Sequence, residues 1–179
     1  NAPFLVLADA NVDDAVSGAM LAKMRNGGAA CTAANRFYVA KEIADEFTTK
    51  LSNSMASLKM TGGTSAGAQL GASVSVKERN KIAELVDAAV SNGAQIKTGG
   101  KTPVGAGAFY PATVLIVKSD NPILKSEIFG PVAPIVITAS DEEAIELANA
   151  TEFGLISYVY SSDLKWEIRV AEALESGMV

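Results

Sequence analysis

The sequence of 179 residues contains no histidine and one cysteine, Cys31. A cysteine hydrolase needs an imidazole to accept the thiol proton, so the absence of histidine argues against that class. A single cysteine forms no disulfide or redox pair within the chain, and a structural zinc site needs several Cys or His ligands. We therefore expect no metal site. Cys31 is then either an inert buried thiol or a nucleophile activated by a group other than histidine.

Clusters of basic residues and long apolar runs are also missing. The 15 Lys and Arg residues are scattered among 20 Asp and Glu residues, and the net charge is -5. This pattern disfavours nucleic acid as a partner. The longest apolar runs, such as residues 131–137, are too short to cross a membrane. Because no secretory signal is visible either, we expect no membrane partner and a reducing, cytoplasmic compartment.

Strand-like and helix-like segments alternate along the chain. Alternation of this kind indicates an α/β fold, a three-layer open sheet that is mostly parallel and has helices on both faces. The apolar periodicity predicts strands at residues 4–7, 36–40, 95–98, 113–117, 134–138 and 155–160. It predicts helices at residues 11–24, 41–58, 78–92, 141–149 and 163–175. In the first helix we expect Val12, Val16, Met20 and Met24 to form the buried face.

Several residues are typical of helix ends. Gly93 is expected to follow the end of the third helix. Ser140 is expected to cap the fourth helix, with Glu143 completing a capping box. Ser161 or Ser162 is expected to cap the last helix.

Two segments contain side chains that could carry chemistry. Cys31 lies among glycines and alanines, which are too small to shield a thiol from a bound molecule. The segment 125–131 (KSEIFGP) places Glu127 and Phe129 beside a Gly-Pro turn, between two expected strands. Taken alone, Glu127 reads as a solvated carboxylate, Phe129 as a core anchor and Arg25 as a surface cation at a helix end.

Together these segments resemble the catalytic domain of the NAD(P)-dependent aldehyde dehydrogenases. Residues 25–31 (RNGGAAC) resemble the active-site cysteine motif, and residues 127–132 (EIFGPV) match the Glu-Ile-Phe-Gly-Pro-Val signature. The resemblance runs through the whole chain, because residues 1–3, 149, 153–155, 160–161 and 177–179 also follow the family's order and spacing. It implies that residues 1–179 form a single catalytic domain.

The resemblance implies a role for each residue. Cys31 would attack the aldehyde carbon and form a thiohemiacetal, which becomes a thioester after hydride transfer to NAD or NADP. Its backbone N–H would form half of an oxyanion hole. Glu127 would accept hydrogen bonds from the nicotinamide ribose, and Phe129 would pack near the nicotinamide.

For the substrate, the resemblance points to succinate semialdehyde. Arg25 matches an arginine that binds the distal carboxylate in that branch of the family, and a planar guanidinium suits a carboxylate. Three positions depart from common family patterns. Ala29 stands where Gln or Glu is usual, Ser126 stands where a second acidic residue is common, and Ala33 replaces a second cysteine that forms a redox switch in some members.

By the same resemblance, the general-base glutamate, the oxyanion asparagine and the dinucleotide-binding domain lie upstream of Asn1. We therefore expect a fragment of a longer chain that is inactive in isolation, with a full-length parent that forms a dimer or tetramer. Two alternatives stay open. One is a non-catalytic binding or assembly module built on this fold, and the other is an aldehyde dehydrogenase with a different substrate.

Overall fold

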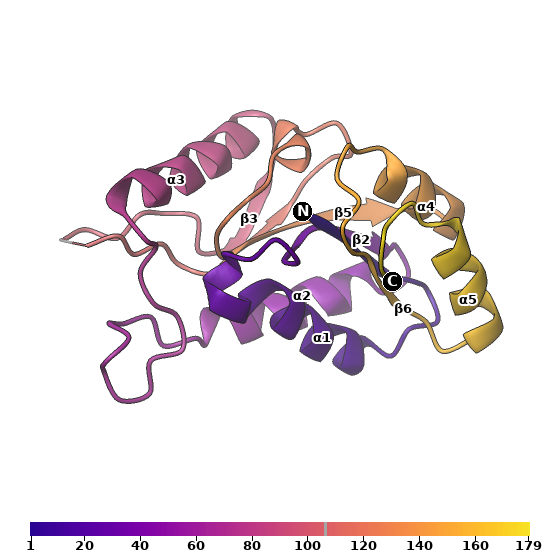
Figure 1. The fold of residues 1–179 in the computed structure, drawn as a ribbon, viewed down its shortest axis with the longest axis horizontal. Coiled ribbons are helices and arrows are strands. Elements are labelled where there is room, and N and C mark those ends of the chain that lie inside the picture. Colours follow the sequence, from indigo (N-terminus) through magenta and orange to yellow (C-terminus); the bar gives the residue numbers. More distant parts are fainter. Residues whose placement is uncertain (106) are drawn as a thin grey trace.

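The six strands found in residues 1–105 and 107–179, the part of the chain described by the computed structural model, form one sheet in the order β3-β4-β5-β2-β1-β6 (Figure 1). Their bounds are Ala2–Val6 (β1), Ala34–Ala40 (β2), Gln95–Thr98 (β3), Thr113–Ile116 (β4), Val132–Thr138 (β5) and Tyr158–Tyr160 (β6). Every neighbouring pair is parallel except β3–β4, which is antiparallel at one edge. The predicted open, mostly parallel sheet is confirmed.

Helices cover both faces of this sheet (Figure 1). They are α1 (Val12–Met24), α2 (Ala44–Ala56), α3 (Val76–Ser91), α4 (Asp141–Asn149) and α5 (Leu164–Ala173), with short 3-10 helices η1 (Arg25–Gly28) and η2 (Pro122–Lys125). Successive side chains of a strand point to opposite faces. In β1, Phe4 and Val6 therefore pack with α1 and α2, whereas Leu5 packs with the layer that contains α3, α4 and α5. This gives the three predicted layers.

The helix ends follow the sequence signals with two differences. Gly93 has a φ of +88° directly after α3, as a residue that ends a helix requires. Ser140 caps α4 as predicted, but the Glu143 carboxylate accepts a hydrogen bond from the N–H of Ala139 (2.6 Å) instead of that of Ser140. The capping box is therefore displaced by one residue.

The predicted cap of α5 is wrong. Asp163 caps this helix by accepting hydrogen bonds from the N–H groups of Lys165 and Trp166. Ser161 instead donates to the carboxylate of Asp9, which lies just after β1. The same carboxylate accepts the backbone N–H of Ser162 (3.1 Å), so a residue distant in sequence determines where the helix begins.

None of the helices in the described ranges is both long and apolar enough to span a bilayer.

Candidate active site

Cys31 lies in a tight connection between α1 and β2. After α1 the chain passes through η1, where Asn26, Gly27 and Gly28 have φ values of 52°, 62° and 80°. The Asn26 side chain supports this turn by donating to the carbonyl of Ala29 (2.9 Å). Left-handed backbone of this kind costs little for glycine and little for asparagine. The turn leaves Cys31 exposed, so the thiol is not buried in the core.

Two glycines bring the two sequence motifs into contact. A Cβ atom on Gly28 would lie 2.1 Å from the carbonyl oxygen of Gly130, a distance that no real Cβ atom tolerates. A Cβ atom on Gly130 would in turn lie 2.4 Å from the Ile82 side chain of α3. The cysteine connection therefore packs directly against the Glu127–Pro131 segment, and α3 supports that segment from behind.

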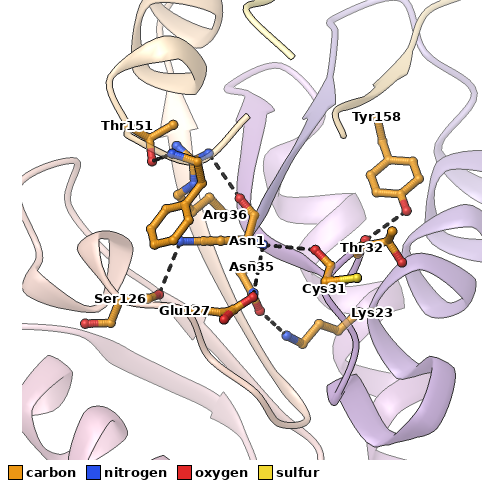
Figure 2. Close-up of polar contacts among 11 residues, drawn as sticks. Asn1, Lys23, Cys31, Thr32, Asn35, Arg36, Ser126, Glu127, Thr151 and Tyr158 are labelled. Atoms are coloured by element: carbon orange, nitrogen blue, oxygen red, sulfur yellow. Dashed lines mark hydrogen bonds and ion pairs between the residues drawn. The ribbon is translucent and has the colours of Figure 1, made fainter. Parts of the chain in front are cut away.

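Asn1 bridges the same two motifs from the start of the chain (Figure 2). Its amino group donates to the carbonyl of Cys31 (3.3 Å) and lies 3.6 Å from Oε1 of Glu127. Its side-chain amide donates to the carbonyl of Ser126 (3.5 Å). Burial lowers the pKa of the amino group, and the Glu127 carboxylate partly opposes that shift. Cys31 and Glu127 thus lie on either side of one residue.

Phe129 opens onto a cavity of about 520 Å³ that both motifs line. The side chain of Phe129 is 47% exposed, although a core position was the simplest interpretation of this residue alone. The other lining residues are Asn26, Gly27, Ala29, Leu70, Gly71, Ala72, Ser73, Val74, Glu78, Tyr110, Gly130 and Pro131. Asn26, Gly27 and Ala29 contribute the cysteine connection's share of this lining.

Arg25 lies at the end of α1, exposed, and makes no ion pair within the described residues. Its charge reaches Tyr158, whose hydroxyl donates to the carbonyl of Thr32 (2.9 Å), next to Cys31. Burial raises the pKa of Tyr158, while the Thr32 hydrogen bond and the charge of Arg25 lower it. Arg25 is therefore a free cation on the Tyr158 side of the cysteine connection.

The backbone N–H of Cys31 has no hydrogen-bond acceptor in the described part of the chain. Free N–H groups beside a nucleophile are the donors from which oxyanion holes are built. Within the same ranges, no group of three His, Cys, Asp or Glu side chains could hold a metal ion.

The sequence interpretation missed Lys23, which is fully buried near these residues. Its amine donates to Oδ1 of Asn35 in β2. The predicted face of α1 is partly wrong, because Val12, Ala15, Val16, Ala19 and Lys23 are buried whereas Met20 and Met24 are only half-buried. Counting the alanines as apolar places Lys23 on the buried stripe, so the helical spacing did contain this signal.

The chain is similar to known proteins along its whole length. The Aldehyde dehydrogenase family matches residues 1–179. A succinate-semialdehyde dehydrogenase of Paenarthrobacter nicotinovorans is 50% identical over 180 residues, which cover 100% of this chain and 40% of that protein. A 3-sulfolactaldehyde dehydrogenase of Pseudomonas putida is 43% identical and is covered to 37%.

Among solved structures, the succinate-semialdehyde dehydrogenase from Burkholderia pseudomallei superimposes with a TM-score of 0.97 at 45% identity, over 100% of this chain and 37% of that one. The chain thus spans about two fifths of the length of these relatives. Because the family model and the fold match all of residues 1–179, this chain belongs to the aldehyde dehydrogenase family.

Proposed function

We propose that this chain supplies the nucleophile and part of the cofactor site of an enzyme that oxidises an anionic aldehyde, best represented by succinate semialdehyde. The observation that carries the proposal is the contact between the Cys31 connection and the Glu127–Pro131 segment. Packing of Gly28 on Gly130 holds an exposed thiol beside a carboxylate and an open aromatic ring. Those are the groups that attack on a carbonyl and recognition of a nucleotide require.

The proposed chemistry begins at Sγ of Cys31. The sulfur bonds to the carbonyl carbon as the thiol proton passes to water, and the π electrons of the carbonyl become the negative charge on its oxygen. The free N–H of Cys31 donates to that oxygen, and one such donor typically contributes about 3 kcal/mol of transition-state stabilisation. After oxidation the carbon is held as a thioester, which water cleaves to release the acid and restore the thiol.

The residues around Glu127 fit a nicotinamide cofactor, NAD or NADP. Its carboxylate is 39% exposed and is free to accept hydrogen bonds from ribose hydroxyls. The exposed ring of Phe129 offers an apolar surface to a flat ring, at the mouth of the cavity of about 520 Å³. When bound, the cofactor supplies the acceptor for the hydride.

Arg25 supports an anionic substrate. A guanidinium without an internal partner binds a carboxylate or a sulfonate through charged hydrogen bonds. The Paenarthrobacter and Pseudomonas enzymes act, by their names, on aldehydes that carry a carboxylate and a sulfonate, respectively. Sulfolactaldehyde is accordingly the alternative substrate, favoured by 43% identity to the Pseudomonas enzyme.

The test uses a full-length parent enzyme, with NAD(P)H formation followed by absorbance. Replacing Arg25→Gln should lower kcat/KM for succinate semialdehyde about 10- to 100-fold, the usual worth of a charged hydrogen bond. Activity on butanal, which has the same chain length and no charge, should change less than about twofold. Arg169→Gln, the same substitution on α5, is the matched control and should leave both substrates unaffected.

An equal loss on succinate semialdehyde and butanal would contradict the role of Arg25. A higher kcat/KM of the parent enzyme for sulfolactaldehyde than for succinate semialdehyde would favour the alternative substrate. Thiol labelling addresses the other class of function. A Cys31 thiol that reacts with iodoacetamide no faster than a model peptide, in the full-length enzyme, would favour a non-catalytic module. Assembly into a dimer or tetramer and a cytoplasmic location remain predictions.

A further inference from the structure

Lys23 is an unusual feature of this site, because its amine is fully buried and makes one side-chain hydrogen bond. An ammonium has three N–H donors. In the described residues the Lys23 amine donates to Asn35 and to no other group. Burying a charge with so few partners is costly, and a lysine in this situation gives up its proton readily. Its location behind the cysteine connection therefore needs an explanation beyond packing.

The surroundings of Lys23 contain further incomplete polar groups. The side-chain amide nitrogen of Asn35 and the side-chain oxygen of Asn1 are both buried and have no partner among residues 1–105 and 107–179. Figure 2 shows the Lys23 amine directed toward Asn35 and toward the carboxylate of Glu127. Lys23 thus donates to Asn35 and lies near enough to Glu127 to interact with its charge.

We propose that Lys23 is a positioning residue for cofactor binding, acting on Glu127 through its charge, and that it takes up a proton when a ribose docks on Glu127. This inference rests on the proposed function, because it assigns Glu127 to the ribose. A docked ribose removes water from a carboxylate that is now 39% exposed. The carboxylate then interacts more strongly with a nearby cation, so the protonated form of Lys23 becomes more favourable.

The other charged groups of the cluster do not replace Lys23. Arg36 of β2 is buried and donates to the carbonyls of Asn1 and Ala148, and a guanidinium keeps its proton at every working pH. The Asn1 amino group is a cation only as a chain end. In a polypeptide extended before Asn1 it becomes an uncharged peptide nitrogen, which leaves Lys23 as the titrating cation that faces Glu127.

The pKa of Lys23 fits this role. Burial lowers it from 10.5 to about 7, and the Glu127 charge opposes the shift. This lowered pKa places the titration of Lys23 near neutral pH. If docking raises its pKa by about one unit, cofactor affinity falls by up to about tenfold as the pH rises from about 6 to 9. The affinity is higher on the acid side because the bound state holds more protons.

The experiment measures NAD and NADP binding to a full-length parent enzyme by calorimetry, from about pH 6 to 9, in pairs of buffers with different ionisation enthalpies. A Cys31→Ala background removes the thiol, so that the sulfur takes no part in the proton balance. The parent should take up a fraction of a proton on binding, with the largest uptake between about pH 7 and 8. Lys23→Met and Lys23→Gln should abolish this uptake and flatten the affinity profile.

The control is Lys50→Met, which removes an exposed lysine of α2 paired with Asp13 and Glu46 and should keep the full uptake. Equal proton uptake in parent and Lys23 variants would overturn the proposal while leaving the proposed function intact. Glu127→Gln separates the two ideas. Loss of uptake together with weaker binding supports both, whereas unchanged binding in Glu127→Gln would overturn the ribose assignment and this inference with it.

Discussion

Replacement of Gly28 by alanine tests the contact on which the site depends. The new Cβ atom would lie 2.1 Å from the carbonyl oxygen and 2.6 Å from the carbonyl carbon of Gly130. Both are backbone atoms, so the two segments must move apart. The left-handed φ of +80° adds strain of about 1–2 kcal/mol, and overpacking adds about 1–3 kcal/mol. We expect the free energy of unfolding to fall by about 2–5 kcal/mol.

Urea unfolding of this chain, followed by circular dichroism, measures that loss. Gly93→Ala is the matched control, because Gly93 has a φ of +88° and nothing within 4 Å of the position of a Cβ atom. It should show the backbone strain alone, about 1–2 kcal/mol. If Gly28→Ala costs no more than Gly93→Ala, within about 0.5 kcal/mol, the Gly28–Gly130 contact does not hold the motifs together.

Three further predictions concern stability. Leu51→Ala in the core between α2 and the sheet should lower the free energy of unfolding by about 2–5 kcal/mol, measured by urea titration; a loss typical of a surface position would contradict the placement of α2. Asp163→Ala should lower the free energy of unfolding by about 1 kcal/mol, as loss of a helix cap does. A larger decrease in Ser162→Ala would show that Ser162 caps the helix instead. The pKa of Lys23 falls from 10.5 in the unfolded chain to about 7 in the folded one, so the unfolded chain binds more protons between pH 7 and 10.5. The free energy of unfolding should therefore rise with pH in this range, by at most about 1.4 kcal/mol per pH unit. Lys23→Met should remove this part of the slope in thermal or urea unfolding, and parallel pH profiles for parent and variant would show that Lys23 does not titrate near neutrality.

The order of helices and strands could be predicted because it depends on local apolar periodicity. Phe47, Leu51 and Met55 recur at helical spacing and are all buried in α2. The alternation of strands with helices was likewise sufficient for a mostly parallel sheet with two covered faces. These features depend on the chain's own spacing and need no knowledge of distant contacts.

The details that depend on distant residues could not be predicted. Asp163 caps α5 because Asp9 accepts hydrogen bonds from Ser161 and Ser162, the two serines that precede Asp163. The bridging position of Asn1 arises only because the start of β1 lies between the Cys31 and Glu127 segments. Sequence alone gives no measure of such contacts.

The candidate site shows the same division. Motif resemblance singled out Cys31, Glu127, Phe129 and Arg25, and the structure gathers the segments that carry them around one end of α1. Lys23 was overlooked because a lysine in an amphipathic helix is expected on its solvent face. Lys23 follows Ala15, Val16 and Ala19 on the buried face of α1, where Asn35 of β2 accepts its hydrogen bond.

The central claim is that the exposed sulfur of Cys31 bonds to the substrate carbon. Its direct test is acid quenching of a full-length parent enzyme during turnover of succinate semialdehyde with NAD or NADP, followed by mass spectrometry of the peptide that spans residues 26–36. We predict a succinyl adduct on Cys31 that disappears, together with turnover, in Cys31→Ser. An adduct on another residue, or undiminished turnover in Cys31→Ser, would contradict the account.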